Sequence, residues 1–273
     1  MALVRLNFES QCLGNNLEVG IILPDIRRDE KPAAFYGNEE KYKVLWLLHG
    51  TNGDYSDWIR KSNVERYACE RRLMVVMPSA LNSNYVNWPG FMTGYRMGDF
   101  LTEELMPLVH GWFPASGRRQ DNFIAGLSMG GSGAMQYAVN HPEKFEACAV
   151  LSASPRNLRE KAKNPDARMQ NSIRNAGGYE AYVASDSNTW ETLGKGSGKS
   201  ALPRFYLTCG TEDFLYADYL EFKEYAQKLN LNAVFEEFEG YCHEWRFWDM
   251  TIQRAMDFFL TGRLPETDRY LRA

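Results

Sequence analysis

The feature that most constrains this chain is an apolar run, residues 123–125, that leads directly into Gly126-Leu127-Ser128-Met129-Gly130 and then into a helical pattern. When Gly-x-Ser-x-Gly lies between a strand and a helix, the serine sits on a sharp turn that lifts its hydroxyl clear of the sheet. Glycines on either side let the strand and the helix approach closely. The five-residue pattern is weak alone, but its context predicts a nucleophile elbow with Ser128 as the nucleophile.

Short apolar runs recur along the 273 residues at the spacing expected of buried strands. Examples are residues 44–48, 73–77, 147–151 and 205–209. Continuous runs of this kind are typical of parallel strands that are buried on both faces. Helical patterns separate them, and one of these, residues 129–140, directly follows the serine turn. The alternation predicts an α/β fold, a central and mostly parallel sheet flanked by helices, in a single domain over residues 1–273.

One segment, residues 155–203, interrupts this alternation. It is polar, contains a cluster of Lys and Arg residues and becomes rich in glycine near its end. We place it between the sixth and seventh strands of the sheet, after the run at 147–151. A solvated helical excursion would explain its composition, whereas a cap beside the active site would explain its position. We expect a cap-like excursion within the single domain, with its inner edge touching the site.

Residues 194–200, Gly-Lys-Gly-Ser-Gly-Lys-Ser, look like a phosphate-binding loop. The Walker pattern requires a glycine where this chain has Leu193, and the preceding residues do not form an apolar strand. Pro203 also stands where the following helix should begin. We therefore expect a turn here and no nucleotide site.

The overall composition excludes several classes of function. Thirty-one Lys and Arg against 35 Asp and Glu give a net charge of −4, so no basic field favours nucleic acid or an anionic membrane. No apolar stretch reaches the length of a membrane span, and the N-terminus lacks the apolar core of a signal peptide. The five cysteines form no Cys-x-x-Cys pair, which is typical of a reducing compartment. We expect a cytoplasmic protein without nucleic-acid or membrane partners.

A serine hydroxyl is unreactive at neutral pH without a base, and the chain has only four histidines. His49, His110 and His141 each occupy a position where a structural role is equally good. In one common order of such triads, the histidine follows both the serine and the acid. Only His243 lies there, in the loop after a strand expected at 234–238. Elimination therefore selects His243 as the general base.

The acid that orients this imidazole should lie between Ser128 and His243 in the chain. Asp213 is the best candidate, because it lies in a tight turn directly after the strand expected at 205–209. Glu212, its neighbour, is the alternative. Aspartates in the polar excursion have no strand behind them to hold them at the sheet edge.

An oxyanion formed at this serine needs two backbone N–H donors. One should be the N–H of Met129, the residue after the nucleophile. The second should come from the loop after the strand at 44–48, where Gly50 lets the chain turn inward and Thr51 offers its N–H. In this interpretation His49 has a structural role.

Several short motifs together point to one family. They are Leu47-Leu48-His49-Gly50, Glu104-Leu105, Phe113-Pro114, Gly126-Leu127-Ser128-Met129-Gly130-Gly131, His141-Pro142-Glu143-Lys144-Phe145 and Cys209-Gly210-Thr211-Glu212-Asp213-Phe214. Their combination resembles the esterase branch of the α/β-hydrolase superfamily, and within it the tributyrin-esterase type. That branch is related to S-formylglutathione hydrolases and to feruloyl and acetyl-xylan esterases. The matches extend from about residue 17 to residue 259, and 155–203 is the weakest part.

The resemblance implies an α/β-hydrolase fold and a serine carboxylesterase with its triad on Ser128, Asp213 and His243. The expected substrate is a small-molecule ester with a short acyl chain, on a sugar or a small alcohol. Alternatives with the same triad are a feruloyl or acetyl-xylan carbohydrate esterase, an S-formylglutathione thioesterase and an acyltransferase. No metal or other cofactor is expected, because no His-Glu-x-x-His occurs and the histidines are scattered. Whether the chain forms a homo-oligomer stays open.

Aromatic residues lie in the loop after the strand at 73–77 and just beyond His243. Tyr85, Trp88 and Phe91 belong to the first group, and Trp245 to the second. They are candidate substrate-binding residues, because loops at the carboxyl ends of parallel strands line the cleft. Burial under a long loop would explain them equally well. As a pocket wall they would favour compact acyl groups, from acetyl to butyryl.

Overall fold

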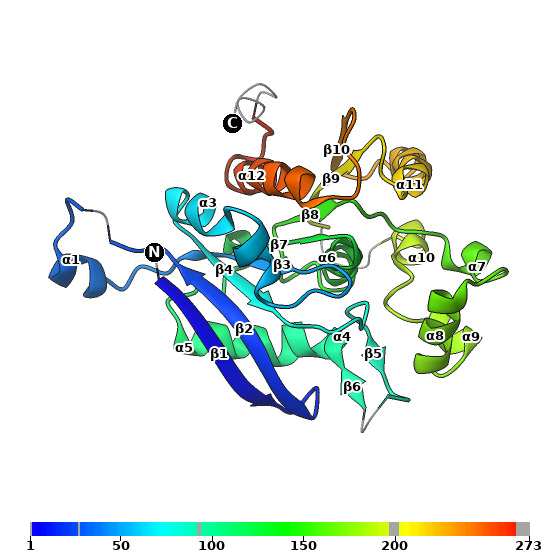
Figure 1. The fold of residues 1–273 in the computed structure, drawn as a ribbon, viewed down its shortest axis with the longest axis horizontal. Coiled ribbons are helices and arrows are strands. Elements are labelled where there is room, and N and C mark those ends of the chain that lie inside the picture. The colour runs from blue at the N-terminus through cyan, green and yellow to red at the C-terminus, as the bar shows by residue number, and fades with distance from the viewer. Residues whose placement is uncertain (1, 27, 92–93, 197–201, 266–273) are drawn as a thin grey trace.

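The computed structural model describes residues 2–26, 28–91, 94–196 and 202–265 (Figure 1). Its centre is an eight-stranded sheet with strand order β1-β2-β4-β3-β7-β8-β9-β10. Strands β3, β4, β7, β8, β9 and β10 are parallel, whereas β2 is antiparallel to both of its neighbours. The expected α/β-hydrolase fold is confirmed. The strand bounds are Ala2–Ser10 (β1), Asn15–Leu23 (β2), Lys43–Leu48 (β3), Leu73–Pro78 (β4), Asn122–Leu127 (β7), Ala147–Leu151 (β8), Arg204–Gly210 (β9) and Ala233–Phe238 (β10).

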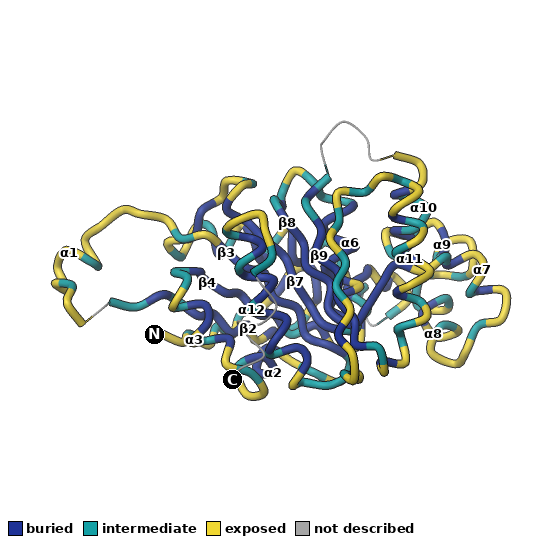
Figure 2. Tube along the Cα trace, turned by 90° about the horizontal axis from the view of Figure 1, so that it is seen from above, coloured by how far each residue is buried: buried dark blue, intermediate teal, exposed yellow. Residues whose placement is uncertain are grey.

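The parallel strands are apolar because helices cover both faces of the sheet. Alternate strand residues enter two separate cores. One core contains side chains of α5 (Met106–Trp112), α6 (Met129–Asn140) and α11 (Tyr216–Lys228). The other contains side chains of α2 (Asp57–Lys61), α3 (Val64–Glu70) and α12 (Trp245–Thr261). In Figure 2 the strands form the continuous buried centre between these layers.

The N-terminal strand β1 was not expected from the sequence. Among the strands that the structure describes, it pairs with β2 alone at the edge of the sheet, and most of its residues alternate between exposed and half-buried positions. Val4, Leu6 and Phe8 pack against the core, whereas the residues between them face solvent. A strand with a single half-buried face gives a weaker apolar pattern than the central strands do.

The connection between β4 and β7 contains a two-stranded ribbon and a composite helix. The ribbon pairs β5 (Asn87–Trp88) with β6 (Tyr95–Arg96). The helix begins as α4 (Met97–Asp99), continues as a π-helical segment over Phe100–Leu105 and ends as α5. One helix therefore extends over residues 97–112, and its middle part has the wider π-helical winding.

The segment between β8 and β9, the sixth and seventh strands of the main sheet along the chain, is called the cap here and is described over residues 155–196 and 202–203. Its helices are α7 (Leu158–Lys161), α8 (Ala167–Asn175), α9 (Tyr179–Val183) and α10 (Thr189–Gly194). They gather at one end of the molecule, opposite the exposed segment that contains α1 (Pro32–Tyr36) (Figures 1 and 2). Of the run that imitates a phosphate-binding loop, residues 197–200 lie outside the described residues, and a helix rather than a strand precedes it.

Among the helices that the structure describes, none is both long enough and apolar enough to cross a membrane.

Candidate active site

The candidate residues lie at one edge of the sheet because parallel strands end there together. Thr51 follows β3, Ser128 follows β7, Asp213 follows β9 and His243 follows β10. Residues far apart in sequence are thus placed on neighbouring loops above one edge. The strand order, with β3 beside β7 and β9 beside β10, determines which loops are adjacent.

Ser128 lies on a sharp turn between β7 and α6, as the motif predicts. Its backbone has φ 51° and ψ −119°, a conformation that residues other than glycine rarely adopt. The strain is held by the surrounding structure, because Ser128 N–H donates to Leu151 O at 2.9 Å. The turn presents a half-buried serine at the start of a helix.

The two flanking glycines are required by close backbone contacts. A Cβ atom on Gly126 would lie 2.3 Å from the carbonyl carbon and oxygen of Gly130. A Cβ atom on Gly130 would lie 2.5 Å from the carbonyl oxygens of Leu48 and His49. Backbone atoms cannot move aside as a flexible side chain can, so both positions exclude any larger residue. The elbow therefore packs directly against β7 and the end of β3.

Asp213 and His243 form a direct pair. His243 Nδ1 lies 2.8 Å from Asp213 Oδ2, while Oδ1 of the same carboxylate accepts the Leu215 N–H at 2.9 Å. The Asp213 side chain is buried, and that of Glu212, the alternative acid, is exposed. With Nδ1 engaged by the carboxylate, Nε2 on the opposite edge of the ring is left to exchange a proton with a serine.

Burial alone would raise the pKa of Asp213, but hydrogen bonds outweigh it. Contacts with His243, the Leu215 N–H and the Ser152 hydroxyl hold the pKa of this carboxyl below its ordinary value. Ser152 is itself buried, and its hydroxyl accepts a hydrogen bond from Trp248 Nε1 at 2.9 Å. The acid is therefore ionised and fixed in position. Ser152 and Trp248 are supporting residues that the sequence did not reveal.

The loop after β3 is held by His49, whose ring is buried. Its Nε2 accepts the Ala80 N–H at 2.9 Å, so Nδ1 carries the proton that it shares with Gly50 O at 2.7 Å. Burial lowers the pKa of His49, which keeps the imidazole neutral. This histidine ties the loop to the end of β4. Its position matches the structural role that the sequence suggested.

A cavity of about 280 Å³ adjoins the serine. Thr51, Ser128 and Met129, which belong to the predicted nucleophile and oxyanion loops, line it together. The backbone N–H groups of Thr51 and Met129 donate to no other group among the residues that the structure describes, so both are available to a ligand. The cap forms much of the remaining wall, including Arg156, Leu158, Arg168, Met169, Ser172, Tyr182, Ser185, Ser187 and Thr189.

The predicted aromatic wall is not part of this cavity's lining. Tyr85 is completely buried, with its hydroxyl donating to His49 O at 3.0 Å. Trp88 and Phe91 pack against each other with ring centroids 5.6 Å apart. The loop instead lines the cavity through Asn84 and Val86, the two neighbours of Tyr85. Asn84 and Tyr85 lie in a turn and have positive φ angles of 55° and 58°. This turn directs the Tyr85 ring into the core, while its smaller neighbours face the cavity.

Trp245 also lies in a packing position. Its ring is 5.2 Å from that of Trp58 and 5.3 Å from that of Trp248, in edge-to-face contacts, and Lys61 Nζ lies over it. Trp245 therefore packs α12 against α2. Among the described residues, Trp245 does not line the cavity beside Ser128.

Two residues missed as site residues reach the cavity from outside the elbow. Arg168 of α8 donates to Thr51 Oγ1, on the oxyanion loop. Phe214, directly after Asp213, lies with its ring 4.6 Å from that of His243 and lines the cavity. In the sequence, Arg168 is one of the basic residues clustered in segment 155–203, and nothing there distinguishes it from the others. The position of Phe214 next to the acid was the signal that could have identified it.

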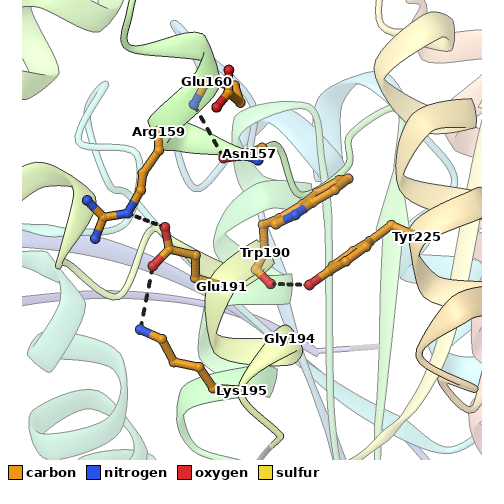
Figure 3. Close-up of a pocket in the computed structure, with 8 residues that line it drawn as sticks. All are labelled: Asn157, Arg159, Glu160, Trp190, Glu191, Gly194, Lys195 and Tyr225. Carbon is orange, nitrogen blue, oxygen red and sulfur yellow. Dashed lines mark hydrogen bonds and ion pairs between the residues drawn. The ribbon is translucent and has the colours of Figure 1, made fainter.

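A second pocket lies apart from this site (Figure 3). It lies between the cap and α11 and shares none of its described lining residues with the cavity at Ser128. Its central acid, Glu191, pairs with Arg159 and with Lys195, and Tyr225 donates to the Trp190 carbonyl. Figure 3 shows these groups directed at one another. Of these two pockets, the cavity at Ser128 is the one lined by the candidate nucleophile.

The family model described as "Putative esterase" matches residues 10–259. The chain belongs to this esterase family. It is a carboxylic ester hydrolase, and the resemblance inferred from its motifs is confirmed.

Known relatives of this esterase support the same assignment. It is 28% identical over 268 residues to an acetyl esterase of Caldicellulosiruptor saccharolyticus, covering 94% of this chain and 98% of that protein. The structure of FphF, a fluorophosphonate-binding serine hydrolase of Staphylococcus aureus, is 29% identical, with a TM-score of 0.80 over 95% of this chain and 98% of that one. The S-formylglutathione hydrolase FrmB of the same organism is also 29% identical, with a TM-score of 0.76 over 95% and 99%.

Proposed function

We propose that this esterase cleaves short-chain acyl esters through an acyl-enzyme on Ser128. Ser128 attacks the ester carbonyl while His243 Nε2 takes its proton, and Asp213 stabilises the imidazolium that forms. His243 then returns the proton to the leaving alcohol. Water then attacks the acyl-enzyme in the same way, with His243 taking its proton, and the carboxylic acid product is released from Ser128. The observation that carries the proposal is the bond from Asp213 to His243 at 2.8 Å, at the same sheet edge as the strained Ser128.

The negative charge of each tetrahedral intermediate needs donors that are already in position. We assign this role to the backbone N–H groups of Thr51 and Met129. Met129 lies at the N-terminus of α6, where the helix dipole also favours negative charge. The loop that contains Thr51 is fixed through His49 and Ala80 and through the contact with Arg168. Both donors are thus held before the substrate arrives.

The size and lining of the cavity support short acyl groups and a polar alcohol. A volume of about 280 Å³ leaves little room for a long chain. Many of the lining residues carry hydroxyl or amide groups, including Asn84, Gln136, Ser154, Ser172, Ser185, Ser187 and Thr189. Such groups bind the hydroxyls of a sugar or a small polyol better than they bind a hydrocarbon chain. Acetyl to butyryl esters of sugars or small alcohols are therefore the proposed substrates.

The proposed location is the cytoplasm. All five cysteines are free thiols, and of these Cys12, Cys148 and Cys209 are buried, an arrangement suited to a reducing compartment.

A panel of 4-nitrophenyl esters from acetate to decanoate tests the substrate class, with acetylated xylo-oligosaccharides and methyl ferulate assayed beside it. The highest kcat/KM is expected between acetate and butyrate, and faster cleavage of decanoate than of butyrate would contradict the compact cavity. An added acceptor alcohol separates hydrolysis from acyl transfer, since a transferase would form the new ester in water.

The nucleophile is tested by Ser128→Ala, which should lower kcat by about 10⁴-fold or more. Labelling by a fluorophosphonate probe should disappear at the same time. Ser132→Ala is the matched control, because Ser132 lines the same cavity one turn along α6. Labelling that persists in Ser128→Ala, or is lost in Ser132→Ala, would place the nucleophile elsewhere.

A further inference from the structure

Phe214 is an apolar ring held in the open at the entrance of the active site. The residue is 75% exposed, although it lines the cavity that contains Ser128. Isolated exposed apolar residues are common on protein surfaces and need no explanation by themselves. The Phe214 ring, however, lies beside His243, the proposed general base, with ring centroids 4.6 Å apart.

The turn that contains Phe214 is fixed by the acid of the triad. Asp213 Oδ1 accepts the Leu215 N–H at 2.9 Å, and the Asp213 carbonyl accepts the Tyr216 N–H at 2.9 Å. Phe214 lies between these two bonds, so its backbone is held by the same residue that orients His243. The backbone that carries the ring is therefore fixed in advance, which lowers the entropic cost of binding a ligand against it.

His243 has an aromatic neighbour on each of two sides. Trp248, which is buried, contacts the imidazole edge-to-face with ring centroids 4.9 Å apart at 88°. Phe214 contacts it with ring centroids 4.6 Å apart at 49°. Trp248 supports the imidazole from the protein interior. Phe214 adjoins it with an exposed ring that also lines the cavity.

The chemistry of the reaction determines which half of the substrate reaches Phe214. The oxygen of the leaving alcohol takes its proton from His243, so it must come within hydrogen-bond distance of the imidazole. The acyl group is bonded to Ser128 from nucleophilic attack until deacylation, so it points away from the leaving oxygen. A group attached to the leaving oxygen is therefore the part of the substrate that lies next to the Phe214 ring.

We infer that Phe214 is a specificity-determining residue that binds the alcohol moiety of the ester and favours a flat-faced ring over an open chain. This rests on the proposed acyl-enzyme function. An exposed aromatic face gains most from a partner that covers it as a plane, either an aryl ring or the apolar face of a pyranose. The contact is made in the acylation step and is absent from the acyl-enzyme after the alcohol has left.

The experiment compares three acetates of primary alcohols: benzyl acetate, methyl 6-O-acetylglucopyranoside and n-butyl acetate. All three form the same acetyl-enzyme, so differences among them arise before or during acylation. Phe214→Leu keeps an apolar side chain but removes the flat face, and Phe214→Tyr restores that face. Leu220→Ala is the control for loss of an exposed apolar residue, since Leu220 is exposed on α11 and does not line the described cavity.

In Phe214→Leu, kcat/KM is expected to fall about 3- to 10-fold for the ring-bearing acetates and less than about 2-fold for n-butyl acetate. Phe214→Tyr and Leu220→Ala should behave as the unmodified enzyme. The hydrolysis rate of the preformed acetyl-enzyme should be unchanged in all variants. A loss confined to the benzyl ester or to the pyranoside still supports the inference and identifies the ring as aryl or sugar.

An equal loss on all three acetates, with slower deacylation, would overturn the inference and make Phe214 a support for His243 alone. Unchanged kinetics in Phe214→Leu would also overturn it. These outcomes differ from failure of the proposed function, in which the unmodified enzyme itself would cleave none of the three acetates.

Discussion

The carboxylate of Asp213 bonds His243 through one oxygen and the Leu215 backbone N–H through the other. The two carboxylate oxygens therefore have different roles. Oδ2 sets the tautomer of the imidazole, whereas Oδ1 fixes the carboxylate on the turn that follows β9. The exposed neighbour Glu212 makes no such contact with His243 among the described residues.

Asp213→Asn should lower kcat by about 10⁴-fold, because an amide presents the wrong hydrogen-bonding partner to Nδ1 and favours the wrong tautomer. Glu212→Gln, which removes the adjacent acid, should leave kcat within about 2-fold. Steady-state kinetics on a short-chain aryl ester measures both. If the glutamine variant were the more damaged, the acid of the triad would have to be reassigned.

The stability contribution of Asp213 should depend on pH in a defined direction. Its pKa is lower in the folded protein than the ordinary value of about 3.9, so ionisation of this carboxyl favours the folded state. The contribution is complete above about pH 4 and is lost as the pH falls through the folded-state pKa. Denaturant unfolding from pH 7 to pH 3 should show the gap between the unmodified enzyme and Asp213→Asn narrowing below about pH 4. A gap that widens on acidification would have the wrong sign.

Gly126→Ala should prevent the elbow from forming. Its Cβ would lie 2.3 Å from the backbone of Gly130, and the expected loss in free energy of unfolding exceeds about 3 kcal/mol. Gly111→Ala on α5 is the control, since its Cβ would meet no heavy atom within 4 Å. There the exchange should stabilise the helix by about 0.5–1 kcal/mol. Thermal unfolding of the two variants gives the comparison, and equal effects would argue against close strand–helix contact at the elbow.

The contact of Arg168 with Thr51 Oγ1 should couple the cap to the oxyanion loop. Arg168→Met and Thr51→Val each remove the bond while keeping the Thr51 N–H, so each should lower kcat/KM modestly, by about 2- to 5-fold. Because the two changes remove one shared contact, the double variant should lose little more than either single variant. Arg174→Met, on the same helix, is the matched control. Fully additive effects in this cycle would show that the two side chains act independently.

The sequence alone determined the elbow and the identity of the fold. Short continuous apolar runs that alternate with helical patterns are typical of parallel strands buried on both faces. A Gly-x-Ser-x-Gly turn between such a run and a helix is typical of the nucleophile elbow. Chain order then selected His243 and Asp213, because both follow apolar runs whose carboxyl ends must share an edge with Ser128. The sequence did not predict the half-buried edge strand β1, since a single packed face gives only a weak alternation of apolar and polar residues.

Tertiary structure alone decided what surrounds these residues. The sequence could not say which of Asn84, Tyr85 and Val86 would face the cavity, because that depends on the rotation of one loop against α6. Nor could it bring Arg168 of the cap to Thr51, or place Ser152 and Trp248 behind the acid. These contacts join segments whose separation along the chain carries no periodic signal. The positions of the candidate catalytic residues are determined by strand order. The lining of the cavity is determined by how the loops pack above the sheet.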